Sequence, residues 1–162
     1  MKQLLVIRHA KSSWDDITMG DFDRPLNERG EKDAHILAKR MVEKAVKIDA
    51  IISSTANRAI STAGSFAKEY GIKKQSIITF DKLYHAPLDI FYEVIEDISD
   101  KFDTVAIVAH NPGITEFVNE LTDIKIDDMD TCGIYAIQIP IKHWRDFEDS
   151  DKNFWFFDSP KS

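Results

Sequence analysis

The sequence predicts an α/β fold with a mainly parallel sheet covered by helices. Short β-branched apolar runs alternate along the chain with segments whose apolar residues recur at helical spacing. Two of these runs, 3–7 and 103–109, are almost continuously apolar, as strands buried on both faces are. No internal repeat and no Pro/Gly-rich linker interrupts the alternation. Because 162 residues is the length of one ordinary domain, we expect a single domain over residues 1–162.

The first half of the chain is expected to hold three strands and two helices. The first strand covers about 3–8, and a polar loop without structure of its own follows over 11–26. Asn27 then caps a helix whose apolar face runs from 34 to 45. The second strand covers 49–53, Ser53-Ser54-Thr55 reads as a strand-to-helix cap, and the next helix carries Arg58 in its first turn. The third strand covers 76–80.

The second half is expected to add one parallel strand and two antiparallel strands at one edge of the sheet. Pro87 suits the start of a helix that runs to about 98. The fourth strand, 103–109, ends in His110-Asn111-Pro112-Gly113, and another helix follows over about 114–121. The runs 133–139 and 153–157 are further strands. We place them near one edge of the sheet, in an antiparallel arrangement.

The composition argues against a nucleic-acid-binding, a secreted or a membrane-spanning protein. The net charge of -7 argues against a nucleic-acid surface, which needs a basic stripe. A single cysteine, Cys132, allows no internal disulfide and fits a reducing compartment. The apolar run 4–7 is too short for a signal peptide, and no apolar stretch approaches the ~20 residues of a membrane span. We therefore expect a cytoplasmic protein that binds neither nucleic acid nor a membrane.

Charged and titratable residues follow several of the predicted parallel strands. Arg8 and His9 end the first strand, Arg58 follows the second and His110 follows the fourth. The third strand leads to Asp81, Tyr84 and His85. Since the carboxyl ends of parallel strands share one edge, where ligands bind, these side chains should meet there.

The expected pocket contains two arginines and two histidines, and this set suits a phosphoryl dianion. An arginine guanidinium can donate two parallel hydrogen bonds to phosphate oxygens, and the N-termini of helices add backbone N–H donors. A neutral imidazole is then free to act as a nucleophile, and two arginines with a second imidazole supply charge stabilisation without a metal. The sequence thus predicts phosphoryl chemistry, although an Arg-His pair that merely follows a strand is the plainer interpretation of that motif alone.

Four motifs in order resemble those of the histidine phosphatase (phosphoglycerate mutase-like) superfamily. They are Val6-Ile7-Arg8-His9-Ala10, Asp23-Arg24-Pro25-Leu26-Asn27-Glu28-Arg29-Gly30, Ser53-Ser54-Thr55-Ala56-Asn57-Arg58-Ala59 and Ala109-His110-Asn111-Pro112-Gly113. The compact length and the Arg-Pro-Leu and His-Asn-Pro-Gly forms are most similar to the SixA-type phosphohistidine phosphatase branch. The resemblance implies a three-layer αβα sandwich with a mostly parallel sheet.

The resemblance also implies roles for individual residues. His9 is the nucleophile that becomes phosphorylated, while Arg8, Arg58 and His110 hold the phosphoryl oxygens. Arg24 matches a further phosphate-contacting arginine, and we name Ser12 with it as substrate-binding. No metal and no cofactor are implied. Ala10 stands where the family usually has Gly, but it keeps the backbone carbonyl that can orient the nucleophilic ring.

A general acid is harder to find. Larger phosphoester hydrolases of this family carry a Glu or Asp after the third strand, and here Asp16, Asp81, His85 and Asp89 are all candidates. An alkoxide leaving group needs this acid, a contribution of ~10²–10⁴ in rate. An imidazole leaving group needs it less, because it can leave already protonated. The missing acid therefore favours phosphohistidine as the substrate. Because the chain is too short to build a lid over the site, we expect the phosphohistidine to belong to another protein, such as a phosphotransfer domain.

Other functions remain open at this point. The first is a broad phosphomonoesterase in which Asp81, His85 or Asp89 is the acid. The second is a module that binds phosphate or phosphoproteins without turnover. The third is a metal-dependent hydrolase built on His9, His110 and acidic loop residues, against which the paired arginines argue. The oligomeric state and the physiological partner are not predicted.

Overall fold

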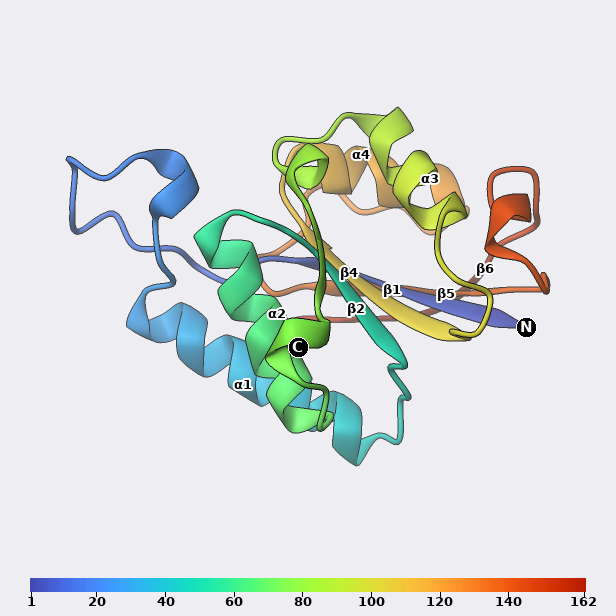
Figure 1. The fold of residues 1–162 in the computed structure, drawn as a ribbon, viewed down its shortest axis with the longest axis horizontal. Helices are drawn as coiled ribbons and strands as arrows, with labels where there is room; N and C mark the ends of the chain where they lie inside the picture. The colour runs from blue at the N-terminus through green and yellow to red at the C-terminus, as the bar shows by residue number, and fades with distance from the viewer.

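A six-stranded sheet in the order β3-β2-β4-β1-β5-β6 forms the centre of the computed structural model, which describes residues 1–162 (Figure 1). Parallel pairing joins β1 to β4, β4 to β2 and β2 to β3, whereas β5 pairs antiparallel with both β1 and β6. The prediction of a mostly parallel sheet with an antiparallel edge is thus confirmed. The strands are β1 (Lys2–Arg8), β2 (Ala50–Ser54), β3 (Ile78–Phe80), β4 (Thr104–Ala109), β5 (Ile134–Ile139) and β6 (Asn153–Asp158).

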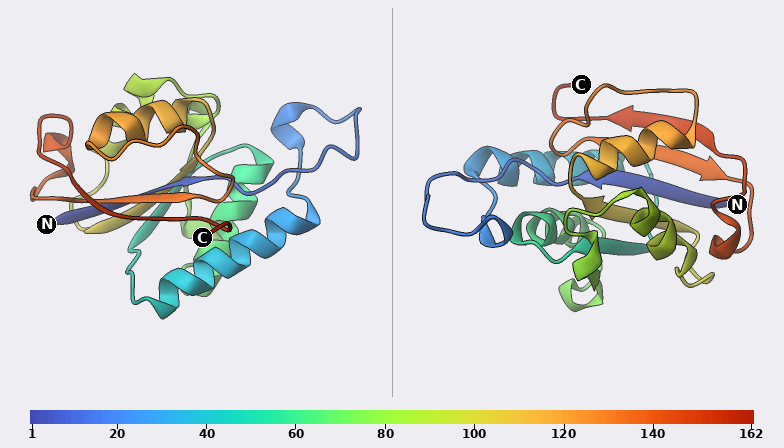
Figure 2. Two further views of the ribbon diagram at one scale, coloured as in Figure 1. Left: turned by 180° about the vertical axis from the view of Figure 1, so that it is seen from behind. Right: turned by 90° about the horizontal axis from the view of Figure 1, so that it is seen from above.

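Helices cover both faces of the sheet, so the fold has three layers. Figures 1 and 2 show α1 and α2 on one face and α3 and α4 on the other. Side chains of β1 alternate between the two cores: Leu4 and Val6 pack with the α3–α4 layer, and Leu5 and Ile7 with the α1–α2 layer. The helices are α1 (Glu28–Glu43), α2 (Asn57–Glu69), α3 (Leu88–Glu96) and α4 (Gly113–Leu121). None of them has the length and apolar content needed to cross a membrane.

One of the two predicted helix caps is confirmed and the other is wrong. Asn27 caps α1 as expected, because its Oδ1 accepts a hydrogen bond of 2.7 Å from the Gly30 N–H. The predicted cap of α2 at 53–55 is wrong: Ala56 is the N-cap and uses no side chain. Ser54 is instead the last residue of β2, and its hydroxyl accepts from the Ala56 N–H at 3.2 Å.

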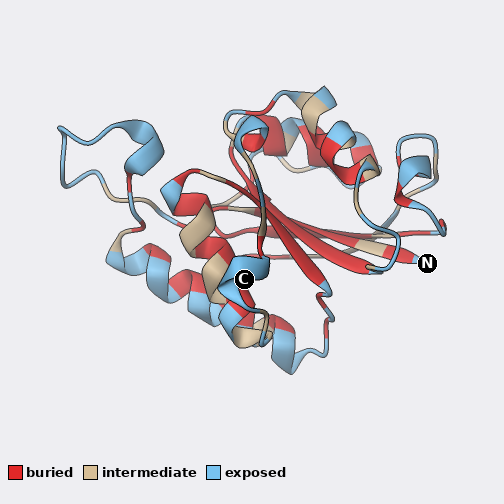
Figure 3. Ribbon diagram, viewed as in Figure 1, coloured by how far each residue is buried: buried red, intermediate tan, exposed pale blue.

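The long loop after β1 is more ordered than predicted. Residues Asp21–Asp23 form a short 3-10 helix, and Ser12 and Leu26 form an isolated β-bridge that closes the base of the loop. Figure 2 shows the loop projecting from the end of the sheet, and Figure 3 shows its outer part exposed while the strands are buried. The third strand is shorter than expected, since residues 74–76 form another 3-10 helix.

Two glycines allow backbone segments to approach closely around the carboxyl edge of the sheet. A Cβ on Gly30 would lie 2.1 Å from the carbonyl oxygen of Lys11, and one on Gly113 would lie 2.1 Å from that of Ala86. Either contact would push a loop away from a helix N-terminus. Gly30 thus sets α1 against the loop after β1, and Gly113 sets α4 against the loop after β3.

Candidate active site

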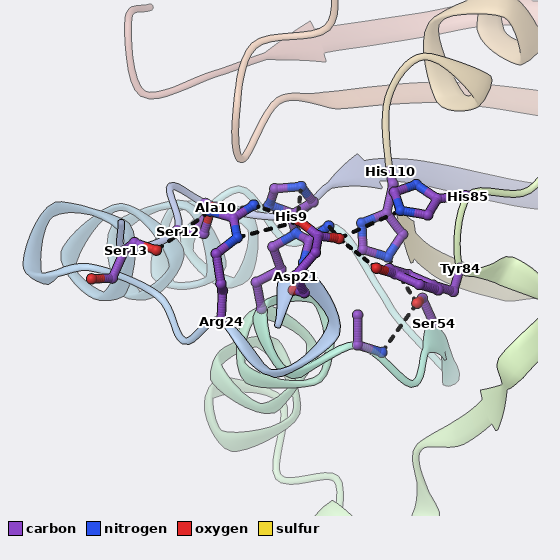
Figure 4. Close-up of polar contacts among 12 residues, drawn as sticks. His9, Ala10, Ser12, Ser13, Asp21, Arg24, Ser54, Tyr84, His85 and His110 are labelled. Atoms are coloured by element: carbon purple, nitrogen blue, oxygen red, sulfur yellow. Dashed lines mark hydrogen bonds and ion pairs between the residues drawn. The ribbon is translucent and has the colours of Figure 1, made fainter. Parts of the chain in front are cut away.

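The carboxyl ends of the parallel strands bring distant residues together. Arg8 of β1 is in register with Ala109 of β4, so His9 and His110, which follow them, are neighbours. The centres of the two imidazole rings lie 5.1 Å apart. Arg58 reaches the same place from the first turn of α2, where its Nε–H points at His9. Figure 4 shows the side chains of His9, His110 and Asp21 gathered at this point. This arrangement follows from the strand order and needs no unusual local structure.

His9 is buried, and the backbone fixes its orientation. Its Nδ1–H donates to the Ala10 carbonyl oxygen at 2.7 Å, which leaves the Nε2 lone pair unprotonated. The Ala10 carbonyl therefore has the orienting contact expected from the sequence. The long hydrogen bond from the Arg58 Nε–H, 3.4 Å, ends on this Nε2 atom. Burial lowers the pKa of His9 to about 4, and the charges of Arg58 and Arg8 act in the same direction. His9 is thus a neutral imidazole whose Nε2 is unprotonated at physiological pH.

His110 is held by Ser54, a residue of β2 that the sequence presented only as a cap. Nε2 of His110 lies 2.8 Å from the Ser54 hydroxyl, and its Nδ1 is buried without a partner. Burial lowers the pKa of His110 to about 3, assisted by the charges of His9 and Arg58. His110 is therefore a second neutral imidazole, with one ring nitrogen left for a bound group.

Arg8 and Arg24 both line the site. Nη1 of Arg8 donates to the Met129 carbonyl at 2.7 Å, while its Nε is buried without a partner. Burial lowers the pKa of Arg8. Nη1 of Arg24 donates to the Ser12 hydroxyl at 2.7 Å, and its guanidinium lies over the Trp14 ring, 3.5 Å from the centre. Ser12 and Arg24 therefore belong to one contact at the cavity wall.

Asp21 is the residue in the site that the sequence analysis missed. Its Oδ2 lies 3.0 Å from Nη2 of Arg58, and its Oδ1 accepts from Arg24. The Tyr84 hydroxyl donates to the same carboxylate, and Nε2 of His85 lies 3.4 Å away. Burial opposes the charge, but the hydrogen bonds from Tyr84, Arg24 and Arg58 outweigh it and hold the pKa of Asp21 well below its usual range. Asp21 is thus a carboxylate that faces the arginines a phosphoryl group would use.

Of the four general-acid candidates, only His85 lies beside the histidines. Its ring centre is 5.9 Å from that of His110, and its backbone has φ of 54°, a strained conformation for a non-glycine residue. Asp16 accepts hydrogen bonds from Thr18 at the loop tip, and Asp81 accepts from Thr55. Asp89 lines a separate surface depression on α3. None of these three carboxylates lines the cavity around His9 and His110.

Thr62 of α2 is a second residue that the sequence did not single out. Its hydroxyl accepts from the Ala10 N–H at 3.0 Å and donates to the Arg58 carbonyl at 2.8 Å. It thereby ties the peptide that orients His9 to the helix that carries Arg58. A threonine within a helix gives no sequence signal for such a role, because its partner lies 52 residues away.

The assembled side chains enclose a cavity of about 420 Å³ at this edge of the sheet. In the whole chain only two buried side-chain nitrogen or oxygen atoms have no hydrogen-bond partner, Arg8 Nε and His110 Nδ1, and both residues line this cavity. Buried polar atoms are nearly always paired, so these two are suited to a bound group. No three metal-ligating side chains are gathered there. All six site residues predicted from the sequence line the cavity: Arg8, His9, Ser12, Arg24, Arg58 and His110.

Comparison with known proteins connects this geometry to a family. The family model described as the histidine phosphatase superfamily (branch 1) matches residues 4–84. An uncharacterized chloroplastic protein of Arabidopsis thaliana is 29% identical over 153 residues, covering 90% of this chain and 70% of that protein. The match of the family model spans half of the chain and includes the first three strands.

Solved structures share the whole fold. The SixA protein from Agrobacterium tumefaciens has a TM-score of 0.80 at 24% identity, covering 98% of this chain and 99% of that one. A protein histidine phosphatase SixA complexed with tungstate has a TM-score of 0.82 at 18% identity, covering 98% and 97%. The phosphoglycerate mutase-like architecture expected from the motifs is therefore confirmed. The chain belongs to the histidine phosphatase superfamily and is a phosphatase of the hydrolase class.

Proposed function

We propose that this phosphatase hydrolyses phosphohistidine on a protein through a covalent phospho-His9 intermediate, without a metal. The observation that carries the proposal is the state of His9: a neutral imidazole whose Nδ1–H is bound to Ala10, leaving Nε2 as the nucleophile. Arginines on either side of that nitrogen can neutralise a dianion. Each charge-assisted hydrogen bond to a phosphoryl oxygen contributes roughly 1.5–3 kcal/mol.

In the first step, His9 Nε2 attacks phosphorus in line with the bond to the substrate nitrogen. The P–N bond breaks as the new N–P bond forms, and the substrate imidazole, which carries a proton on its other ring nitrogen, takes the bonding electron pair and leaves as a neutral ring. Arg8 Nε and His110 Nδ1, the two unpaired buried atoms, are suited to receive phosphoryl oxygens during this transfer. Arg58 joins them once its contacts to Asp21 open.

In the second step, water attacks phosphorus and His9 leaves as a neutral imidazole. The proton released from water stays on the phosphate that forms. Neither step draws on a strong general acid. The surroundings of the nucleophile fit this requirement, because Asp21 is held as a carboxylate and Asp16, Asp81 and Asp89 do not line the cavity.

The lack of a nearby protonated acid favours a P–N bond over an alkyl phosphate ester. A histidine nitrogen can be protonated before it leaves, whereas an alkoxide requires a proton at departure. The likeness to a protein histidine phosphatase SixA that was solved with tungstate, a tetrahedral oxyanion, agrees with this substrate class. His85 beside His110 favours one alternative, a broad phosphomonoesterase in which His85 is the acid.

A substrate panel tests the proposal. Wild type and His9→Ala are assayed with a phosphohistidine protein, phosphoramidate, p-nitrophenyl phosphate and a sugar phosphate. We expect kcat/KM on the P–N substrates to exceed that on the sugar phosphate by about 10²-fold or more, the range attributed to a general acid. Comparable turnover of the sugar phosphate would favour the phosphomonoesterase instead. Tight phosphate binding with no turnover of any substrate would favour a binding module.

A further inference from the structure

Exposed apolar side chains are concentrated on the loop that borders the cavity. We call residues 13–23 the projecting loop. Eight large apolar residues of the chain are exposed, and half of them belong to this segment of eleven residues: Trp14 (72% exposed), Ile17 (93%), Met19 (37%) and Phe22 (39%). Single exposed apolar residues are normal, but a group on one segment marks a binding surface.

The hydrogen bonds that hold the loop in place do not bury its apolar side chains. The base of the loop is fixed, since Ser13 N–H donates to the Pro25 carbonyl and Asn57 donates to the Asp23 carbonyl. At the tip, the hydrogen bonds are local: Thr18 and Met19 donate to Asp16. Figures 2 and 3 show this tip standing away from the body of the molecule with its surface exposed. The loop is therefore held in place while Trp14 and Ile17 remain largely exposed and Met19 and Phe22 partly so.

Carboxylates accompany the apolar residues. Between residues 12 and 23 the chain carries four aspartates and no lysine or arginine. Asp21 turns into the site, whereas Asp15, Asp16 and Asp23 are exposed and form no ion pair. The projecting loop therefore places three exposed, unpaired carboxylates beside a cavity lined by arginines.

The apolar surface is continuous with the cavity. Trp14 is the only apolar residue in the cavity lining, and it is also the first residue of the apolar group on the loop. Its ring lies against the guanidinium of Arg24, which also lines the cavity. The exposed apolar group on the loop therefore begins at the cavity wall. A molecule that places a phosphoryl group at His9 and extends outward past Trp14 would lie along the projecting loop.

Building on the proposed function, we propose that the projecting loop is the docking surface for the protein that carries the phosphohistidine. That protein presents apolar side chains and Lys or Arg beside its phosphorylated residue: the phosphoryl group enters the cationic cavity, the apolar side chains cover Ile17 and Met19, and the cations face Asp15, Asp16 and Asp23. A small phosphoester would leave all these residues uncovered. Charge complementarity of this kind acts mainly on association and specificity.

Two synthetic phosphohistidine peptides of equal length test the docking surface. One has Leu and Lys around the phosphohistidine, the other Ser and Glu; phosphoramidate is the substrate without flanking groups. Wild type is compared with the double variant Ile17→Ser/Met19→Ser, with Asp15→Asn/Asp16→Asn/Asp23→Asn, and with the matched control Ile36→Ser/Val42→Ser, which alters two exposed apolar positions on α1.

We expect wild type to favour the Leu/Lys peptide by about tenfold or more in kcat/KM, and the Ile17/Met19 variant to lose most of this preference. The triple aspartate variant should lose about as much and show a weaker dependence of kcat/KM on salt. Phosphoramidate turnover should stay within about twofold in every variant, and the control should match wild type throughout.

Equal turnover of both peptides by wild type, or an unchanged preference in the loop variants, would overturn the docking surface while phosphoramidate turnover upheld the proposed function. Failure of wild type to turn over any P–N substrate would refute the proposed function, and this inference with it.

Discussion

The Asp21 carboxylate lies 3.0 Å from Nη2 of Arg58, and the Asp21 carbonyl oxygen accepts from Nη1 of the same guanidinium at 2.6 Å. With Arg58 Nε–H directed at His9, three of the five N–H groups of this arginine have partners within the chain. A phosphoryl group that binds Arg58 therefore competes with Asp21 for this guanidinium.

Removing the charge of Asp21 should strengthen binding of phosphate. In Asp21→Asn the guanidinium of Arg58 no longer has an internal anion, so an external one competes with a neutral amide. We expect the inhibition constant of orthophosphate to fall by about twofold to fivefold, the scale of one partly exposed ion pair. Asp23→Asn, two residues away and without an ion pair, is the control. Weaker phosphate inhibition in Asp21→Asn would show that Asp21 supports the anion site.

Arg58→Ala should lower kcat/KM by about 10²–10³-fold, the loss seen when one oxyanion donor is removed from a buried site. The reason is that Arg58, buried in the first turn of α2, can present two N–H groups to the transferring phosphoryl group. Arg40→Ala is the control, since Arg40 pairs with Asp158 and does not line the cavity. A loss below about tenfold, 1.4 kcal/mol, would mean that Arg58 does not contact the phosphoryl group.

The two buried imidazoles predict how stability changes with pH. The pKa is lowered to about 4 in His9 and about 3 in His110, whereas an unfolded histidine titrates near 6.5. From about pH 4 to 6.5 the unfolded chain binds more protons than the folded one, so the free energy of unfolding rises with pH and levels off above this window.

Urea titrations across that window measure the effect. Each imidazole adds at most about 1.4 kcal/mol per pH unit to the slope, so His110→Asn should give a slope that is shallower by up to this amount. Histidine ring NMR of the wild type provides a direct check, because the His9 and His110 signals should still be those of neutral rings at about pH 5. Protonation of either ring near pH 6.5 would contradict the burial argument.

His85→Gln separates the two enzymatic functions. If the substrate is phosphohistidine, the leaving nitrogen needs no acid from His85, and turnover of a phosphohistidine peptide should change by less than about threefold. If the enzyme is a phosphomonoesterase with His85 as the acid, turnover of a sugar phosphate should fall by about 10²-fold while p-nitrophenyl phosphate, whose leaving group is stable, is much less affected.

Much of this structure is predictable because the sequence patterns have simple physical causes. Buried parallel strands must be apolar on both faces, so β1 and β4 are visible as runs, and the parallel topology then requires His9 and His110 to meet. Asn27 is readable as a cap because its partner lies only three residues away. These contacts are local or follow from the strand order.

The residues that sequence analysis missed depend on tertiary contacts. Asp21 enters the site only because the projecting loop folds back onto Arg58 and Tyr84. The residues adjacent to Asp21 in the sequence do not predict this course of the loop. Ser54 resembled a cap but ends β2, where its hydroxyl meets His110 from another strand. The position of the carboxylate candidates for the general acid depends on tertiary contacts too: Asp81 lies at the correct strand end, yet its carboxylate accepts from Thr55.

The most direct test of the account is capture of the phosphorylated enzyme. Wild type is mixed with a phosphohistidine peptide that carries a radiolabelled phosphoryl group, quenched in alkali during turnover, and digested for mass spectrometry. The account predicts label that is stable in base and lost in acid, located on the peptide that contains His9, and absent from His9→Ala. Rapid turnover with no labelled enzyme, or label on another residue, would contradict it.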